Sequence, residues 1–294
     1  MAFQLFLLLE AFLMLLPSSF RKVFFSLLAS LAYHISSRYR KIADNNLDFV
    51  FDNKMDKKTK DEIIRYSFKN LLFNFMHLIE IRRMSKDDLL SKINVQNINV
   101  VNKANQENRA IIFVTPHYCA WELGSIAVGL VDKPLNAVFK KLKNLEYQEW
   151  MLESRNIFGN KSLEKSNVLK SLIKLIRDKR SIGIVIDSSM NKREGLEVNF
   201  LGKKTRQTAT PAYLARKYNA CIIPVTIRTD NENNYTLMFF DEIIVENTQD
   251  EKNDILKATQ AQADWLTSVI KKEPKFWFWI HRRWKHEHPE IYKK

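Results

Sequence analysis

A histidine and a glutamate separated by four residues are the side chains of this sequence whose spacing most directly suggests chemistry. His117 and Glu122 follow an apolar run, residues 110–115, that is typical of a short buried strand. An imidazole presented at the end of a strand in an open α/β sheet can take a proton from a hydroxyl as a general base. Positions i and i+5 point about 140° apart on a continuous helix, so the pair can meet only if His117 precedes the first helical turn. We then expect the Glu122 carboxylate to fix the imidazole tautomer and to stabilise the imidazolium.

Other interpretations of the same segment stay open. A bare His-x4-Glu is frequent by chance, so the two residues could be unrelated surface side chains. Cys119, two residues after His117, could form a covalent acyl enzyme with the histidine as its base. A cysteine in this position is as readily a small packing residue. The backbone N–H groups at the start of the following helix could stabilise an oxyanion.

The elements that must position these residues follow an alternating pattern. Short apolar runs typical of strands alternate with segments of helical periodicity, and the last two strands are separated by a polar turn at 230–234, which predicts an antiparallel pair. Such alternation predicts an α/β fold, with a mixed, mostly parallel sheet wrapped by helices. The expected strands are 110–115, 136–140, 182–187, 221–228 and 235–240, and the expected helices are 57–83, 118–131, 145–158, 169–178, 209–218 and 254–271.

Composition narrows the classes of function. The 294 residues carry 47 Lys and Arg against 33 Asp and Glu, and the resulting net charge of +14 predicts an anionic partner, either nucleic acid or an anionic membrane. Six glycines do not form a G-x-G-x-x-G or a Walker A loop, so the usual nucleotide-binding motifs are excluded. Two cysteines exclude a disulfide framework and a cysteine-based zinc cluster. We therefore expect neither a cofactor nor a metal.

The N-terminal region is the most apolar part of the chain. Gln4 and Glu10 are the only polar residues in 1–16, and a second apolar stretch follows at 23–33. Sixteen helical residues span about 24 Å, less than a hydrocarbon core of about 30 Å. The pattern predicts a short or tilted anchor, or a pair of helices lying in the membrane interface. The alternative is a buried amphipathic helix, because Glu10 is costly inside lipid. We divide the chain into this membrane-associated region, 1–40, and a catalytic domain, 41–294.

Several further motifs accompany the His-x4-Glu pair in a fixed order. Together they resemble the late lipid A biosynthesis acyltransferases, the lauroyl and myristoyl transferases of the glycerolipid acyltransferase superfamily. Phe139-Lys140 departs from the family's Tyr-Arg but keeps the charge. The resembling blocks are Leu16-Pro17, Asn46-Leu47, His117 to Gly124 with Trp121 before the acid, Arg155 with Gly159, Asp187, Phe200-Leu201-Gly202 with Thr208, and residues 279–285 (WIHRRWK).

The resemblance implies a reaction and its partners. A fatty acyl group would pass from an acyl carrier protein thioester to a hydroxyl on a lipid A precursor, with His117 as general base assisted by Glu122. The enzyme would need no cofactor and would lie at the bacterial inner membrane, with its catalytic domain on the cytoplasmic side. The basic residues that follow the first apolar segment agree with that orientation. Membrane lipids would be additional partners, and nucleic acid would not.

The phosphates of such substrates predict cationic partners. Lys140 and Arg155 are candidates, although each could be ordinary solvated charge. Arg282 and Arg283 in the C-terminal motif could contact lipid phosphates or the acidic carrier protein. Asp187 could hold one of these cations or a substrate hydroxyl, or could serve only its own loop. Aromatic residues between 276 and 284 could form an interfacial cluster or an ordinary core.

Two other functions remain in competition. The same His-x4-Glu chemistry suits a lysophospholipid or another glycolipid as acceptor. A basic nucleic-acid-binding protein is the non-enzymatic alternative, but no helix-turn-helix, zinc finger or RNP-like aromatic motif accompanies the charge.

Overall fold

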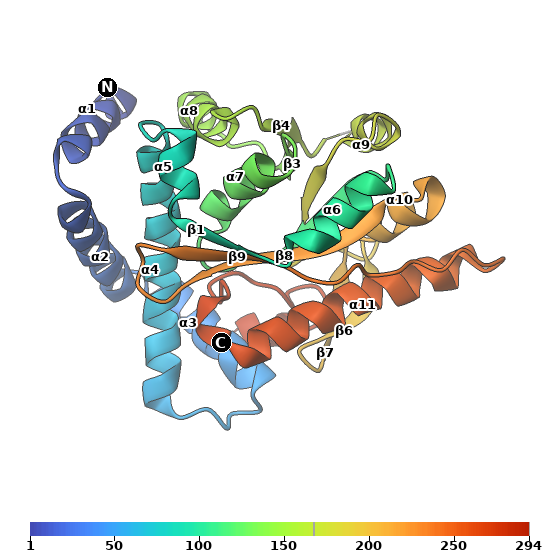
Figure 1. Cartoon of the computed structure of the whole chain (residues 1–294). Helices are drawn as coiled ribbons and strands as arrows, with labels where there is room; N and C mark the ends of the chain where they lie inside the picture. Colours follow the sequence, from blue (N-terminus) through green and yellow to red (C-terminus); the bar gives the residue numbers. More distant parts are fainter. Residues whose placement is uncertain (167, 294) are drawn as a thin grey trace.

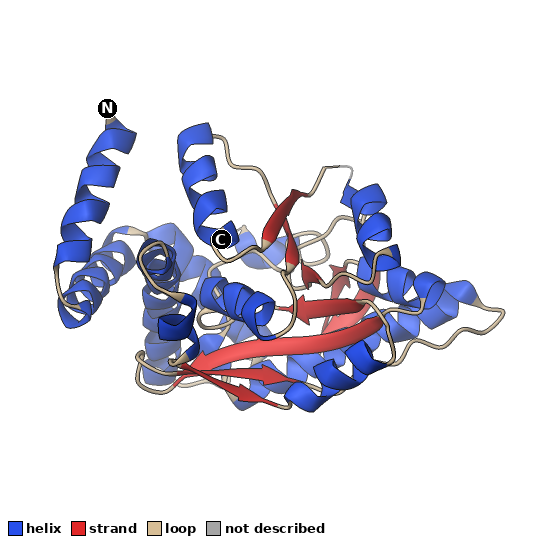
Figure 2. Cartoon of the chain, turned by 45° about the horizontal axis from the view of Figure 1, so that its top comes forward, coloured by secondary structure: helices blue, strands red, loops and turns tan. Residues whose placement is uncertain are grey.

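The fold is described by a computed structural model that covers residues 1–166 and 168–293. Within these residues, seven strands form one sheet in the order β1-β9-β8-β2-β5-β3-β4, drawn in red in Figure 2. Neighbouring strands are parallel except for the antiparallel pair β8–β9. The strands of this sheet are β1 (Ile93–Gln96), β2 (Ile111–Thr115), β3 (Asn136–Phe139), β4 (Lys161–Glu164), β5 (Ile182–Val185), β8 (Cys221–Thr229) and β9 (Tyr235–Phe239). The predicted α/β class with a mixed, mostly parallel sheet is confirmed.

Helices lie on both sides of the sheet. In Figure 1, α6, α7 and α10 lie above it, α11 lies below it, and the long helix α4 runs past one end. The helices are α1 (Ala2–Leu15), α2 (Ser18–Ile35), α3 (Ser37–Val50), α4 (Lys57–Ile81), α5 (Lys86–Leu90), α6 (Ile98–Gln106), α7 (Trp121–Val131), α8 (Leu145–Asn156), α9 (Val168–Arg177), α10 (Thr210–Tyr218) and α11 (Glu251–Lys272), with the short 3₁₀ turns η1 (Pro274–Phe276) and η2 (Pro289–Tyr292).

Short polar elements were not predicted from the sequence. β4 reads KSLE and β1 reads INVQ, so neither strand has a continuous apolar run. The hairpin of β6 (Leu196–Phe200) and β7 (Lys203–Gln207) was also missed, although its two-residue turn has a recognisable cause. Leu201 and Gly202 both have positive φ, 54° and 79°, as a tight hairpin turn requires. Glycine adopts this conformation at no steric cost, so Gly202 permits the turn.

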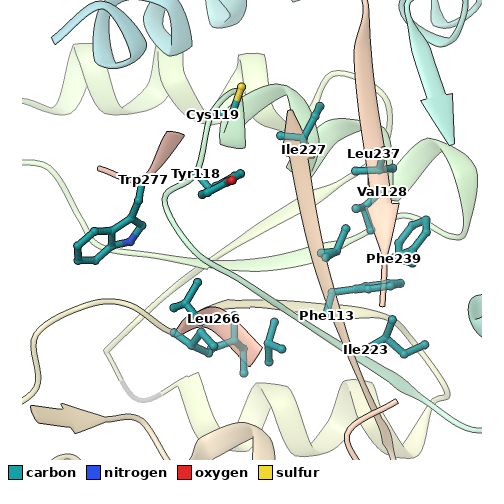
Figure 3. Close-up of a cluster of buried hydrophobic side chains, with 14 of the residues drawn as sticks. Phe113, Tyr118, Cys119, Val128, Ile223, Ile227, Leu237, Phe239, Leu266 and Trp277 are labelled. Atoms are coloured by element: carbon teal, nitrogen blue, oxygen red, sulfur yellow. The ribbon is translucent and has the colours of Figure 1, made fainter. Parts of the chain in front are cut away.

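The hydrophobic core joins the sheet to the helices on both of its sides. Phe113 of β2 and Ile223 of β8 pack in one buried cluster with Val128 of α7 and Leu266 of α11. Figure 3 shows that Trp277 and the loop residue Tyr118 continue the same cluster. The core therefore extends to the loop that follows β2.

The N-terminal helices pack against the outer side of α4 and are drawn in dark blue in Figure 1. Glu10 on α1 is buried, accepts a hydrogen bond from Trp150 Nε1 at 2.8 Å, and lies 3.3 Å from Arg82 Nε. Its carboxylate therefore faces protein. Across residues 1–166 and 168–293, no helix combines the length and hydropathy that crossing a bilayer requires. A row of large apolar side chains on α1 and α2 is nevertheless exposed.

Candidate active site

His117 meets Asp187 because two neighbouring parallel strands end at the same edge of the sheet. Thr115 of β2 is paired with Val185 of β5. His117 and Asp187 each stand two residues beyond that pair, in loops that leave the sheet side by side. His117 Nδ1 lies 2.9 Å from Asp187 Oδ1, and the backbone N–H of His117 donates to Oδ2, also at 2.9 Å.

The two side chains favour each other's charged forms. Burial opposes protonation of the imidazole, but the Asp187 carboxylate outweighs it, so the pKa of His117 is raised. Burial likewise favours the neutral form of Asp187, yet His117 and the hydrogen bonds that it donates hold the pKa of this carboxyl well below its usual value. With Nδ1 donating to Asp187, Nε2 is the nitrogen that is left to accept a proton. The His117 side chain keeps 34% of its surface exposed, so a substrate can reach it.

Glu122 has a different partner from the one that we expected. Arg155 Nε donates to Glu122 Oε2 at 2.8 Å, and Nη2 donates to Oε1 at 2.5 Å, which makes a bidentate pair between α7 and α8. The expected hydrogen bond between Glu122 and the His117 ring is wrong, because Asp187 occupies that position at Nδ1. Glu122 acts on His117 only through its charge, which raises the pKa of the imidazole, whereas Arg155 lowers it. The predicted role of Glu122 in assisting His117 during catalysis remains a prediction.

Asn74 on α4 holds the loop between His117 and α7, and sequence reasoning missed it. Its Nδ2 donates to the carbonyl of Cys119 at 2.7 Å, and its Oδ1 accepts the backbone N–H of Glu122 at 3.0 Å. That N–H is therefore engaged and does not face a reacting oxyanion. Asn74 is buried within an apolar stretch of helix, and a polar residue in such a position is the signal that could have identified it.

Cys119 fits a packing role. It is 1% exposed, and its φ of 48° forms part of the tight turn after His117. Burial raises the pKa of its thiol to about 12, so the thiolate needed for nucleophilic attack is disfavoured. The covalent acyl-enzyme alternative has no support in this geometry.

A cavity of about 480 Å³ opens beside His117. Exposed Lys140, Leu142 and Lys165 lie on its wall and so mark its rim. Arg155, Glu122 and Trp121 line the cavity together with His117. The deeper lining is mostly apolar and includes Phe113, Val128, Leu135, Val138, Leu172 and Ile184. A cavity of this size with a mostly apolar lining suits a ligand that has a hydrocarbon part.

The two C-terminal arginines lie elsewhere. Arg283 is 1% exposed, and its Nη1 donates to the carbonyls of Ser188 at 2.8 Å and Arg206 at 2.6 Å. Burial lowers the pKa of its guanidinium to about 10. The expectation that Arg283 binds a substrate phosphate is therefore wrong, because its donors point into the protein. Arg282 is partly exposed and lies over the Tyr292 ring, and neither arginine is among the described residues that line the cavity.

The C-terminal aromatic residues are core rather than interface. Trp277, Trp279 and Trp284 are 0% exposed, and Trp277 Nε1 donates to Asp187 Oδ2 at 2.9 Å. The interfacial interpretation of this cluster is wrong for these three residues. Within the described ranges 1–166 and 168–293, no group of three His, Cys, Asp or Glu side chains is arranged to hold a metal ion.

Comparisons with known proteins agree with the ordered motifs. A family described as bacterial lipid A biosynthesis acyltransferase matches residues 2–286. The lipid A biosynthesis palmitoleoyltransferase of Escherichia coli (strain K12) is 24% identical over 267 residues, which cover 88% of this chain and 82% of that protein. A lipid A biosynthesis acyltransferase of Haemophilus influenzae is 22% identical over 251 residues, 84% of this chain and 76% of that protein. The phosphatidylinositol mannoside acyltransferase of Mycolicibacterium smegmatis is 22% identical over 228 residues, 76% and 73% respectively.

Proposed function

The chain belongs to the bacterial lipid A biosynthesis acyltransferase family, and from that premise we propose that it transfers a fatty acyl group from an acyl carrier protein thioester to a hydroxyl of a lipid A precursor. One observation carries the proposal: the His117 ring lies on the wall of an apolar cavity and is held through Nδ1 by Asp187. Family membership makes the chain an acyltransferase of lipid A biosynthesis. It argues against the nucleic-acid-binding alternative.

The proposed reaction is a direct transfer with His117 as general base. Nε2 takes the proton of the acceptor hydroxyl while the hydroxyl oxygen forms a bond to the thioester carbonyl carbon. The carbon–sulfur bond then breaks, and the proton on His117 passes to the departing thiolate. Asp187 stabilises the imidazolium between these steps, because its buried carboxylate accepts from Nδ1. No covalent enzyme intermediate forms.

The remaining predicted residues have supporting parts in this proposal. Glu122 favours the imidazolium through its charge and holds Arg155 beside the cavity. Lys140 on the rim would contact phosphate on the acceptor or on the carrier arm. The apolar depth of the cavity would take the acyl chain, and exposed Leu142 would lie at its entrance.

Residues 1–40 are proposed to lie on the inner leaflet, with 41–294 as the catalytic domain on the cytoplasmic side. On α2, the exposed side chains Val23, Leu27, Leu31 and Ile35 recur every four residues and form one apolar stripe. Leu8 and Phe12 on α1 are exposed as well. A stripe of this kind, on helices that do not cross a bilayer, supports lying in the interface.

A glycolipid acceptor other than lipid A is the second candidate. The relative from Mycolicibacterium smegmatis carries the name of a phosphatidylinositol mannoside acyltransferase and is nearly as similar as the lipid A enzymes. A hydroxyl on a phosphorylated glycolipid meets the same base and the same cations. The lysophospholipid alternative rests on the shared chemistry alone.

The test is an acyl-transfer assay with the full chain in detergent. Acyl carrier protein thioesters of several lengths are offered with a lipid A precursor, a phosphatidylinositol mannoside or a lysophospholipid. We expect transfer to the lipid A precursor, and a loss of about 10²–10⁴-fold in His117→Ala. His286→Ala is the matched control, because His286 is exposed and should leave the rate unchanged. Full activity in His117→Ala would refute the mechanism, and acylation of another acceptor alone would refute the substrate assignment.

A further inference from the structure

The segment after α11 returns to the active site and lies against both of its loops. The carbonyl of Phe276 accepts the backbone N–H of Cys119 at 2.9 Å, and the N–H of Phe278 donates to the carbonyl of His117 at 3.1 Å. Trp277, between them, faces Tyr118 in an isolated antiparallel bridge. Figure 3 shows Trp277 beside Tyr118, inside the buried cluster. The loop that carries His117 is thus paired with the C-terminal segment over residues 276–278.

The same segment holds the loop that carries Asp187. Trp277 Nε1 donates to Asp187 Oδ2 at 2.9 Å, His281 Nε2 lies 3.2 Å from the Asp187 carbonyl, and Arg283 donates to the carbonyl of Ser188. The Asp187 carboxylate is 0% exposed, so its hydrogen bonds come from protein groups. Oδ2 receives the indole N–H and the His117 backbone N–H, and Oδ1 faces the His117 ring.

We propose that Trp277 is a positioning residue for the His117–Asp187 pair, and that its indole N–H fixes the rotation of the carboxylate so that Oδ1 stays aligned with His117 Nδ1. The indole cannot turn away, because the ring is fully buried and packs edge-on against Phe200 and Trp284. Its donor therefore has one direction. With the backbone N–H of His117 as its only donor, Oδ2 of Asp187 would leave the carboxylate freer to rotate. The indole N–H of Trp277 is a second donor and restricts this rotation.

The inference rests on the proposed general-base role of His117, but its main readout does not require turnover. Loss of the indole N–H should let the carboxylate turn and weaken its hydrogen bond to Nδ1. The groups that face the pair from other elements remain in place: Glu122 and Arg155 beside the ring, and His281 and Arg283 beside the carboxylate. A change in the titration of His117 would then report the lost hydrogen bond.

The chain offers a matched pair of variants. Trp277→Phe removes the donor to the carboxylate. Trp279→Phe removes an equally buried indole N–H, which donates to the carbonyl of Pro274 at 2.7 Å. Both variants lose one hydrogen bond and part of one ring in the same cluster. A purely structural role predicts that they behave alike.

The experiment follows the ring of His117 by NMR in the full chain, labelled at histidine and assigned with His117→Ala. We expect Trp277→Phe to lower the His117 pKa toward its ordinary value by roughly half a unit to one unit, and Trp279→Phe to leave it unchanged. In the acyl-transfer assay, kcat should fall roughly tenfold in Trp277→Phe at unchanged KM. An equal His117 pKa in the two variants, or a rise in Trp277→Phe, overturns the inference.

A measurement on the unmodified protein covers the case in which Trp277→Phe does not fold. The indole N–H resonance of Trp277 should shift with the same midpoint as the His117 titration, while that of Trp279 stays flat. A Trp277 indole resonance that does not change as His117 titrates would overturn the inference. If the Trp277 resonance follows the His117 titration but no acceptor is acylated, only the proposed function is contradicted. A failure of the inference can therefore be distinguished from a failure of the proposed function.

Discussion

The N-terminal and C-terminal regions are both rich in large apolar side chains, but these side chains are largely exposed in the first region and buried in the second. The N-terminal helical pair, α1 and α2, leaves Leu8, Leu27 and Ile35 more than half exposed. The C-terminal aromatic segment, residues 276–284, buries all three of its tryptophans completely. Apolar composition therefore does not decide which surface meets water. The difference lies in how many elements surround each region: α2 rests on α4, whereas the C-terminal segment lies among α4, α11 and the loop after β2.

The largest effect is expected when an aromatic side chain is removed from the buried C-terminal segment. Trp284→Ala should lower the free energy of unfolding by about 3–5 kcal/mol, because it leaves a cavity between Phe200 and Phe49. Leu27→Ala on the exposed stripe should change it by about 0.5 kcal/mol or less. Chemical denaturation in one detergent measures both values. Equal losses would mean that the two ends are packed alike.

A smaller effect is expected where the N-terminal helical pair is attached to the protein. Glu10→Ala removes the acceptor of the Trp150 indole and leaves Arg82 without this carboxylate. The free energy of unfolding should fall by about 1–3 kcal/mol, because a buried donor loses its partner. Glu153→Ala is the control, since Glu153 also pairs with Arg82 but is largely exposed. If the Glu10 and Glu153 variants were equally stable, α1 would not depend on this contact.

Charge placed on the stripe tests what the exposed end does. The double variant Leu27→Glu with Leu31→Glu should weaken binding to anionic vesicles by about tenfold or more, because it removes apolar contact and adds repulsion. Flotation with vesicles measures this loss. Asn102→Glu with Gln106→Glu places the same charges at the same spacing on exposed positions of α6 and should bind as the unchanged protein does. If both double variants bound the vesicles equally well, the apolar stripe on α2 would not be part of the membrane contact.

The smallest expected effect is the pH dependence of the stability that the His117–Asp187 pair contributes. The folded-state pKa of His117 is raised, so the stability from its pair with Asp187 is present in full below the unfolded pKa of about 6.5. That stability is lost as the pH rises through the folded pKa. Denaturation of the unchanged protein and of His117→Gln between pH 5 and pH 9 should give curves that converge at high pH. Parallel curves would contradict the raised pKa.

Much of the fold was predictable from local pattern. The predicted strands from 110–115 to 235–240 coincide with β2, β3, β5, β8 and β9, because buried strands in such a sheet are continuous apolar runs. β4 and β7 were not predicted, because their residues, KSLE and KKTRQ, are mostly polar. Their pairing partners, rather than their own composition, make them strands.

Four residues of the candidate site were proposed from the sequence, but their hydrogen-bond partners were not. His117, Asp187, Glu122 and Arg155 were all identified from the sequence, and the structure brings all four to one edge of the sheet. Asn74 and Trp277, which hold the two loops, were not assigned to the site. Each is far from its partner along the chain, so no local spacing links them.

Strand periodicity and the order of motifs along the chain were enough to predict the class of fold and the family, and to propose His117 as the base. The hydrogen bond of His117 with Asp187 rather than with Glu122, and the buried position of Arg283, depend instead on how the chain folds. The reason is geometric. His117 and Asp187 meet because β2 and β5 are neighbours in the sheet, and the spacing of residues along the chain does not predict this strand order. The same holds for the two apolar ends, whose burial depends on which elements surround them.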